Sequence, residues 1–322
     1  MKKIINRLKM LYAFTFATSK QKFYPQEVVL ELTNACNLEC IMCPHKKMKR
    51  KIGLLDSNLF KKIIDEISEH SELLYLHGTG ESLIHPQLSK LCLYAHQKKL
   101  RTCLSTNGML LTEELLSCGL DYLIIALDGG TAETYEKIRV GGNFNKLINN
   151  IKNILKVKSS TKICLQMIYM PENSHEVAAF KNLFTKEEQK KIFQFRFKPF
   201  SNTYAEKVVQ KNLERPCFWP WNMMFVCCDG TVSLCCIDYE REICLGDLKE
   251  QSVFEIWNAP QLDTIRKHHQ QKNRHQIELC STCSIPEKYK FNLSFTLASA
   301  FLSAYQVKIL TPIYERISSL KT

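Results

Sequence analysis

From residue 28 onward, short apolar runs rich in β-branched and aromatic residues alternate with longer stretches of amphipathic pattern. The apolar runs, each of which predicts a β-strand, lie at residues 28–34, 73–78, 101–108, 121–128, 162–170 and 192–200. The amphipathic stretches, which predict helices, include 56–71, 88–99, 144–158 and 175–190. Strands that alternate with helices in this way form a parallel sheet with the helices outside it. The pattern therefore predicts an α/β fold whose functional side chains gather at the C-terminal ends of the strands.

The alternation of strands and helices stops after Pro199. Residues 201–286 contain a hairpin signal, Asp229-Gly230 between two apolar runs, and a helical pattern over 253–271. They also contain eight of the fifteen cysteines. We therefore expect a barrel-like domain over 28–204 and a small cysteine-rich module of β-hairpin and helix over 205–286.

Both ends of the chain carry a helical pattern. Within residues 1–27, Ile4, Ile5, Leu8 and Leu11 fall on one face with basic residues around it, and the apolar run is too interrupted for a signal peptide. Residues 287–322 predict a helical tail whose apolar part is too short to span a bilayer. We expect a cytoplasmic protein whose basic N-terminal helix docks on the domain; peripheral contact with a membrane is the less favoured alternative.

The chain has 322 residues and a formal charge of +12. Its lysines and arginines are spread along the helical stretches, whereas a nucleic-acid groove gathers them in a stripe with interleaved aromatic residues. We therefore interpret the charge as a solvated basic surface and expect no nucleic-acid partner.

The cysteines arrive in tight local groups, which favours metal binding over a disulfide framework. The first group is Cys36-x3-Cys40-x2-Cys43, directly after the first predicted strand. Three thiolates on one short loop can hold three corners of a [4Fe–4S] cluster and leave the fourth iron open to a small ligand. The alternative is a zinc site completed by His45 or by a distant residue.

The segments that follow this loop resemble the motifs of the radical S-adenosylmethionine (SAM) superfamily. Gly78-Thr79-Gly80-Glu81 ends the second predicted strand, where the family has Gly-Gly-Glu-Pro, although Ser82 replaces the proline. Further family-like segments follow the later strands in the family's order: Ser105-Thr106-Asn107-Gly108, Ala126-Leu127-Asp128-Gly129 with Arg139 after it, and Met170-x2-Asn173-x2-Glu176. The resemblance covers residues 28–200.

The resemblance implies a partial (β/α)6 TIM-like barrel that binds SAM and a [4Fe–4S] cluster on Cys36, Cys40 and Cys43. It also implies reductive cleavage of SAM to a 5′-deoxyadenosyl radical, which takes a hydrogen atom from the substrate, and a low-potential electron donor of the flavodoxin or ferredoxin type. The residues expected on this basis to bind SAM are Gly78, Thr79, Gly80, Glu81, Ser105, Thr106, Asn107, Asp128, Arg139 and Asn173.

The second group of cysteines resembles the auxiliary-cluster modules of this superfamily, the SPASM domain and its shorter Twitch form. The spacing is Cys217-x12-Gly230-x4-Cys235 and then Cys280-x2-Cys283. The resemblance implies one auxiliary [4Fe–4S] cluster that acts as an electron relay. Its implied ligands are Cys217, Cys235, Cys280 and Cys283. The alternatives are Cys236 in place of Cys235, a ligand role for Cys227 or Cys228, and a zinc ribbon.

We expect a radical SAM oxidoreductase that oxidises a small hydroxylated molecule, similar to a sugar or an aminocyclitol, while the auxiliary cluster accepts the second electron. The 18 positions from Cys217 to Cys235 look like the spacing in the Twitch-bearing dehydrogenase that oxidises an aminocyclitol alcohol. Arg196, on the sixth strand, is the candidate to hold the substrate; otherwise it is a surface residue of an edge strand.

Two other functions remain open. One is modification of a peptide or protein, although a leader-binding domain would have no room before Cys36. The other is a zinc-binding structural protein or a nucleic-acid-binding protein. The colour of the purified protein separates these from an iron–sulfur enzyme, since they are colourless and an iron–sulfur protein is brown.

Overall fold

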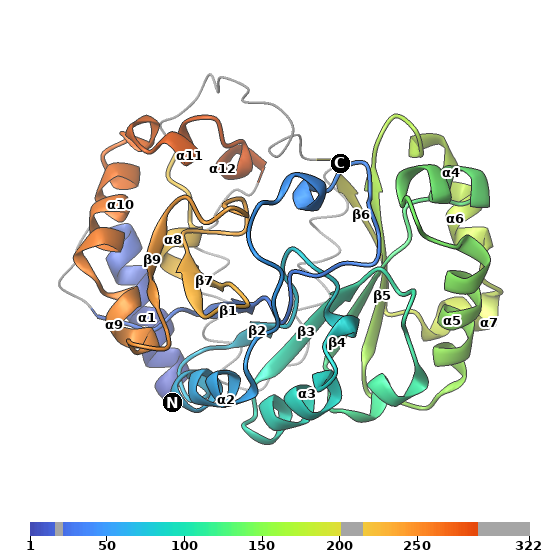
Figure 1. Ribbon diagram of the computed structural model, residues 1–322, viewed down its shortest axis with the longest axis horizontal. Helices are drawn as coiled ribbons and strands as arrows, with labels where there is room; N and C mark the ends of the chain where they lie inside the picture. Colours follow the sequence, from blue (N-terminus) through green and yellow to red (C-terminus); the bar gives the residue numbers. More distant parts are fainter. Residues whose placement is uncertain (17–21, 201–214, 289–322) are drawn as a thin grey trace.

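The computed structural model describes residues 1–16, 22–200 and 215–288, and its centre is a sheet of nine strands (Figure 1). In chain order the strands are β1 Glu27–Leu30, β2 Leu73–Tyr75, β3 Arg101–Thr106, β4 Tyr122–Ala126, β5 Lys162–Tyr169, β6 Gln194–Pro199, β7 Met223–Val226, β8 Thr231–Ser233 and β9 Cys244–Asp247. Their order across the sheet is β6-β5-β4-β3-β2-β1-β7-β8-β9. In this order, all neighbouring strands from β6 at one edge through β1 to β7 are parallel. β8 is antiparallel to β7, and β9 is antiparallel to β8.

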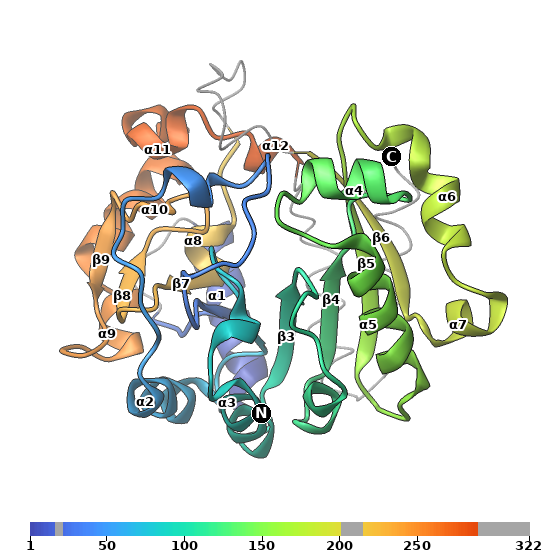
Figure 2. The same ribbon diagram turned by 45° about the vertical axis from the view of Figure 1, so that its right-hand side comes forward.

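This arrangement confirms the predicted α/β class and the six parallel strands of a partial barrel. The sheet is curved but does not close, since β6 and β9 lie at its two edges (Figure 2). β7 lies directly beside β1 and parallel to it, with Val28 opposite Met224. The first strand of the cysteine-rich module therefore extends the barrel sheet, so the module joins the sheet through β7.

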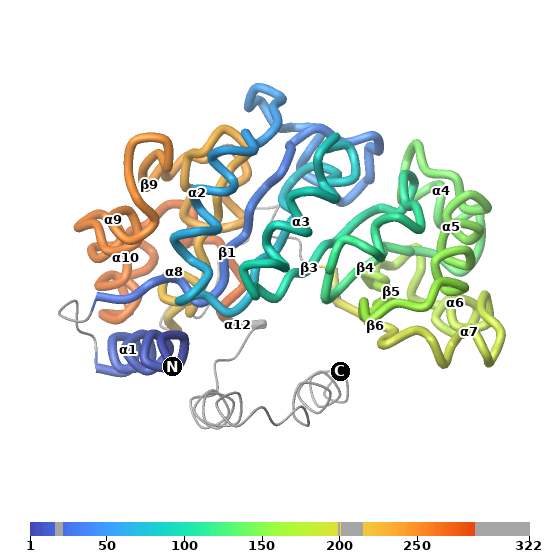
Figure 3. The backbone as a smooth tube through the Cα atoms, turned by 90° about the horizontal axis from the view of Figure 1, so that it is seen from below, coloured from blue at the N-terminus to red at the C-terminus, as the bar shows by residue number. Residues whose placement is uncertain are grey.

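Helices α2 to α7 lie along the outer side of the barrel strands, and the other helices gather at the module end of the sheet (Figures 2 and 3). Together these two groups are the α-helices of the described residues. They are α1 Lys2–Thr15, α2 Ser57–Ile67, α3 Leu88–Gln97, α4 Ala132–Ile138, α5 Phe144–Lys156, α6 Val177–Asn182, α7 Lys186–Lys191, α8 Trp219–Asn222, α9 Val253–Trp257, α10 Pro260–Gln270, α11 Glu278–Ser281 and α12 Ile285–Lys288. Short 3-10 helices follow four of the strands, at Pro44–Lys47, Ser82–Ile84, Glu113–Ser117 and Ser174–Glu176, and another, Arg274–Gln276, follows α10. Residues 289–322, for which a helical tail was predicted, lie outside the described residues.

The main core lies between the sheet and these helices, because alternate residues of each strand point to opposite faces. Leu30, Leu104 and Ile125 point outward into this core, where they join the apolar face of α2. Two smaller apolar clusters occupy the inner face of the sheet, one around Val29 and Phe225 and the other around Cys103, Ile124 and Cys164. The inner face is thus distinct from the core.

Two long predicted helices are each divided in the structure. The stretch 175–190 forms α6 and α7, because Thr185 starts a new helix with a capping box. The stretch 253–271 forms α9 and α10, because Pro260 cannot continue a helix and instead occupies a first-turn position.

Helix α1 packs beside α8 and α10 (Figure 3). Its Asn6 side chain accepts a hydrogen bond from Tyr24 N and donates to the carbonyl oxygens of Tyr24 and His70, while Arg7 forms an ion pair with Glu72. Met10, Leu11 and Ala13 are buried and Ile4 is half-buried, but Ile5 and Leu8 are exposed, so the docked face overlaps the predicted one only in part. In the described ranges, no helix has the length and apolar character needed to cross a bilayer.

Candidate active site

The first three predicted cluster ligands share the loop that leaves β1. Cys40 is buried, and Cys36 and Cys43 are half-buried. The loop is fixed by backbone hydrogen bonds from Glu39 N to Val140 O (2.8 Å) and from Ile41 N to Ile138 O (3.0 Å), which tie it to the end of α4. Burial raises the pKa of the Cys36 thiol to about 11 and also raises that of Cys43. The folded loop therefore holds three thiols whose deprotonated forms need a neighbouring positive charge.

Arg139 supplies positive charge at this loop. Its Nη1 lies 3.4 Å from the sulfur of Cys40, and its Nε donates to Asp128 Oδ2 at 2.6 Å. Asp128 is buried and also accepts a hydrogen bond from Ile168 N at 2.6 Å. The two residues predicted from separate motifs thus form one ion pair, which links the ends of β4 and β5 to the cysteine loop.

Glu81 is fully engaged within the protein. Its carboxylate accepts hydrogen bonds from Thr106 Oγ1 (2.8 Å), Asn107 N (2.7 Å) and Leu83 N (3.0 Å). The side chain is 3% exposed, and burial raises its pKa despite these bonds. Glu81 therefore joins the segment after β2 to the segment after β3.

The remaining predicted SAM contacts are also close to one another. Asn107 Nδ2 donates to Asn37 Oδ1 in the cysteine loop (2.8 Å). Asn173, which is fully buried, donates to Asp128 O (3.1 Å) and Ile168 O (2.9 Å). Ser105 N donates to Nδ1 of His77 at 3.1 Å. The structure therefore gathers all of the predicted segments at the C-terminal ends of β1 to β5.

A buried ion pair that the sequence analysis missed supports the same region. Arg50 binds both carboxylate oxygens of Glu31 at 2.9 Å, and its Nε donates to Tyr239 O at 2.6 Å. Glu31, which is completely buried, also accepts from Thr79 N (3.1 Å) and Cys228 N (3.3 Å). The one available signal was a glutamate inside the apolar strand sequence VVLELTN.

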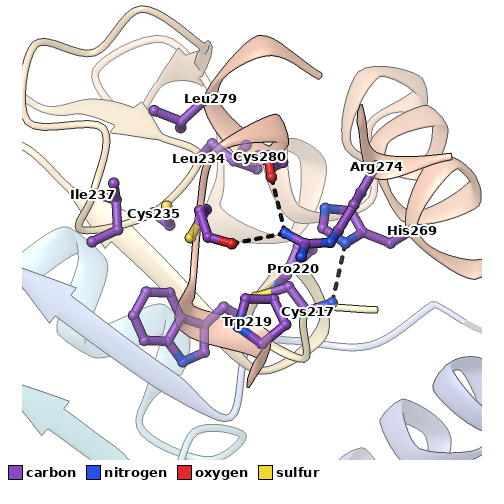
Figure 4. Close-up of a pocket in the computed structure, with 12 residues that line it drawn as sticks. Cys217, Trp219, Pro220, Leu234, Cys235, Ile237, His269, Arg274, Leu279 and Cys280 are labelled. Atoms are coloured by element: carbon purple, nitrogen blue, oxygen red, sulfur yellow. Dashed lines mark hydrogen bonds between the residues drawn. The ribbon is translucent and has the colours of Figure 1, made fainter. Parts of the chain in front are cut away.

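The four predicted auxiliary ligands line a single cavity in the cysteine-rich module (Figure 4). Its other lining residues are Trp219, Pro220, Leu234, Ile237, His269, Arg274, Leu279 and Pro286. Burial raises the pKa of the Cys217 thiol to about 12 and moves that of Cys235 in the same direction. Arg274, fully buried, donates to the carbonyl oxygens of Cys280 (2.9 Å) and Cys283 (3.0 Å), which shapes the loop between these two ligands.

The cysteines named as alternatives do not line this cavity, although Cys236 lies within electrostatic reach of Cys217 and Cys283. Cys236 is not among the lining residues and packs instead with Val29 and Phe225 on the inner face of the sheet. Cys227 belongs to the same inner cluster, and the Cys228 sulfur lies near Gly53. This geometry favours Cys235 over Cys236 as the fourth thiol of the cavity.

The residues present fit iron–sulfur groups at both places. His269 is 1% exposed, and its Nδ1 accepts a hydrogen bond from Cys217 N at 3.1 Å, so its proton is on Nε2. Within the described residues this buried Nε2 has no partner, which suits a cavity meant to hold a sulfur-rich acceptor. In the same residues, no three His, Cys, Asp or Glu side chains gather tightly enough to hold a single metal ion.

Arg196, predicted to hold the substrate, lies half-buried on the edge strand β6. Its backbone is opposite Gln166 of β5. Since Gln166 follows Cys164 by two positions, Arg196 is on the inner face of the sheet, on the same side as the inner cluster around Cys103.

Two family models match the chain, the radical SAM superfamily over residues 30–184 and the SPASM iron–sulfur cluster-binding domain over 217–284. The mycofactocin maturase MftC of Mycobacterium tuberculosis is 36% identical over 129 residues, which are 38% of this chain. The matched part spans only 33% of the length of that curated relative.

Solved structures resemble the chain over a larger share of its length. BtrN in complex with AdoMet and 2-DOIA covers 81% of this chain and 94% of its own, with a TM-score of 0.58 and 19% identity. SuiB of Streptococcus suis bound to the precursor peptide SuiA covers 76% and 67%, with a TM-score of 0.62 and 12% identity. At such identities the likeness establishes the fold, and the family models establish membership. The chain therefore belongs to the radical SAM superfamily, whose members use SAM and a [4Fe–4S] cluster, and it carries the SPASM domain that binds auxiliary iron–sulfur clusters.

Proposed function

We propose that this protein is a radical SAM dehydrogenase that oxidises an alcohol carbon of a small hydroxylated molecule to a carbonyl. The observation that carries the proposal is the cavity with Cys217, Cys235, Cys280 and Cys283 around it. Four thiolates occupy every corner of a [4Fe–4S] cluster, so such a cluster would have no iron open to substrate and would serve to accept an electron.

When bound, SAM and its cluster would remove a hydrogen atom from the substrate, and the auxiliary cluster of the module would accept an electron. Oxidation of an alcohol to a carbonyl removes two electrons and two protons: one proton leaves with an electron as a hydrogen atom from carbon, and the other leaves from the hydroxyl group. The second electron would need a one-electron acceptor, a role that a cluster held by the four module cysteines would fill. Removal of both electrons from the alcohol therefore requires an electron acceptor close to the substrate.

The protein's own residues would hold these reactants in place. Cys36, Cys40 and Cys43 would hold the SAM-side cluster, with Arg139 beside Cys40. The backbone of Gly78 to Gly80 would face the methionine end of SAM, since Glu31 and Glu81 fix this segment from both sides. Arg196 would hold the substrate on the inner face of the sheet.

A second candidate function is modification of a peptide. The identity with MftC, which is named as a maturase, and the fold shared with peptide-bound SuiB favour this candidate. The matched part of MftC is a third of its length, so the similarity lies within a shared domain.

The two candidates differ in the size of the substrate. We would reconstitute the protein anaerobically with iron and sulfide and measure 5′-deoxyadenosine formed from SAM and a reductant. The assay would include either the dialysable or the retained fraction of a cell extract. Stimulation by the dialysable fraction, together with a new carbonyl product, supports the dehydrogenase. Stimulation by the retained fraction alone would contradict it and favour a peptide or protein substrate. The variant with Cys36, Cys40 and Cys43 changed to alanine is the control.

A further inference from the structure

Two cations lie side by side on the inner face of β6. Register places Cys164 opposite Gln194, Gln166 opposite Arg196 and Ile168 opposite Lys198. Cys164 belongs to the inner apolar cluster, and alternate residues of a strand share a face. Arg196 and Lys198 therefore both point to the interior of the partial barrel, and both are half-buried.

The groups that face these cations carry no compensating charge. Arg196 and Lys198 both influence the pKa of Cys103 on β3 and of His77 after β2, so both lie within electrostatic reach of these groups. Burial and the two cations lower the pKa of His77 to about 4, which keeps it neutral. Burial raises the pKa of Cys103 to about 12, so this thiol is also neutral. Cys236, on the module side, is the other group within electrostatic reach of Lys198.

The carboxylates nearby are already engaged. Glu27, at the lower end of the inner face, is hydrogen-bonded to Asn222 and Tyr75. Glu31 pairs with Arg50, and Asp128 pairs with Arg139. Neither Arg196 nor Lys198 forms an ion pair with a described aspartate or glutamate. Arg196 and Lys198 differ in this respect from Arg50 and Arg139, each of which binds a buried carboxylate.

A pair of half-buried cations without a counter-anion is unfavourable in the folded protein. Burial and the repulsion from Arg196 lower the pKa of Lys198 to about 8, which expresses this cost. The arrangement becomes favourable when an anion enters between the two side chains, because charge-assisted hydrogen bonds are the strongest that side chains make.

The position of this pair suits a substrate subsite. Ile168, opposite Lys198, donates its N–H to Asp128, which in turn binds the Arg139 that contacts Cys40. On the other side, Lys198 is within electrostatic reach of Cys236, the neighbour of Cys235 in the module cavity. Lys198 is thus linked to both sets of cysteines, through Ile168 and Asp128 on one side and through Cys236 on the other.

We propose that Arg196 and Lys198 form a subsite for an acidic group, a carboxylate or a phosphate monoester, on the small hydroxylated substrate. This assignment rests on the proposed dehydrogenase function and narrows its substrate from sugar-like molecules in general to acidic ones. An amino-substituted substrate would bring a third positive charge to this place and is disfavoured.

The first test measures anion binding without turnover. Inorganic phosphate is titrated calorimetrically into the reconstituted, SAM-bound protein. We expect the wild type to bind phosphate saturably. The affinity should fall roughly tenfold or more in Lys198→Met and in Arg196→Met, whereas Lys198→Arg should keep most of the wild-type affinity. Lys190→Met, which removes the same charge from an exposed position on α7, should bind phosphate as the wild type does. Equal binding by wild type and Lys198→Met, or no saturable binding by the wild type, overturns the proposal. Iron content and melting temperature of each variant check that it is folded.

The second test uses the 5′-deoxyadenosine assay with the dialysable extract, passed over an anion exchanger at pH 7. We expect the stimulating substance to be retained and to elute with salt. Its appearance in the unbound fraction would overturn the acidic-substrate assignment while leaving the dehydrogenase proposal intact. Loss of stimulation after phosphatase treatment identifies a phosphate monoester, and resistance to phosphatase identifies a carboxylate. Absence of stimulation by every dialysable fraction would contradict the dehydrogenase, and the phosphate titration would then decide the anion site by itself.

Discussion

At the scale of single residues, buried carboxylates organise much of this site. Glu31 receives hydrogen bonds from the segment after β2, from the loop that carries Arg50 and from the hairpin of the module. Glu81 joins the ends of β2 and β3 in a similar way. Such groups are costly to bury unless they are paired, so each implies a well-defined surrounding structure.

The Glu31–Arg50 pair gives a prediction about stability. Arg50→Met should lower the free energy of unfolding by about 3–5 kcal/mol, because it leaves the buried Glu31 charge without its partner. The double variant Glu31→Leu with Arg50→Met should be more stable than Arg50→Met alone, since it removes both charges. Denaturant unfolding under anaerobic conditions would measure both values. A double variant no more stable than Arg50→Met would contradict the interpretation.

The choice between two adjacent cysteines gives a second prediction. Cys235→Ser should lose the auxiliary cluster, about four iron atoms per chain, because Cys235 lines the cavity. Cys236→Ser should keep that iron, since its side chain packs on the inner face of the sheet. Iron analysis and the visible absorption of both reconstituted proteins would check this. The reverse result would make Cys236 the ligand.

Glu176 gives a prediction about pH. Burial raises its pKa, but hydrogen bonds from Thr134, Thr131 and Gly130 more than offset this, so the pKa is lowered from 4.5. A carboxylate with a lowered pKa in the folded state stabilises the protein above its unfolded pKa, and this contribution is lost as the pH falls.

Glu176→Gln should therefore reduce the melting temperature by a similar amount from pH 8 to about pH 5. Below about pH 4.5 the difference between variant and wild type should shrink. Glu187→Gln, on the exposed surface of α7, is the matched control and should change little. A difference that grows on acidification would contradict the predicted direction of the shift.

At the scale of elements, the loops after the strands pack so closely that some of their positions have no room for a side chain. A Cβ atom on Gly80 would lie 2.4 Å from Thr33 O and 2.5 Å from Ala35 O, both in the backbone at the start of the cysteine loop. Gly80→Ala should therefore displace this segment and weaken SAM binding by roughly tenfold, with little change in the iron bound by the module. Equilibrium dialysis with labelled SAM would measure it. Unchanged affinity would show that the loop adapts.

The elements themselves were largely predictable from the sequence. Periodicity located the six strands because each is an apolar run bounded by polar residues, and it predicted the hairpin at Asp229-Gly230, which forms between β7 and β8. The predicted strands are longer than the observed ones. Apolar residues such as Leu76 continue the apolar run because they are buried, but they lie beyond the end of the strand.

The parts of the site that were not predictable depend on distant contacts. The ligand motifs are local and readable, as with Cys36, Cys40 and Cys43. The role of Glu31 required knowledge that Arg50 and Cys228 lie beside it. The period of two along the strand places Lys198 on the same face as Arg196, but only the strand register shows that this face is the inner one.

At the scale of the whole molecule, the continuous sheet makes barrel and module mutually dependent. β1 lies between β2 and β7, and Val29 packs with Phe225 across that junction. A fragment containing only residues 1–204 would expose the edge of β1 and leave Glu31 without the hydrogen bond from Cys228.

We therefore expect the fragment 1–204 to lack a cooperative thermal transition and to bind an apolar dye, although it contains the whole predicted barrel. Calorimetry and dye fluorescence, with the full chain as control, would test this. A fragment that melts as cooperatively as the full chain would contradict the expected dependence.

The pairing of β1 with β7 also has a consequence for folding during synthesis. Glu27 pairs with Met223, so the middle of the sheet cannot be completed until most of the chain has left the ribosome. Contacts between residues so far apart in sequence form slowly, and until they form, the β1 edge is open to pairing with other chains. The sheet of the nascent protein can therefore be completed only after residue 226 has emerged, and until then the β1 edge needs protection from pairing with other chains.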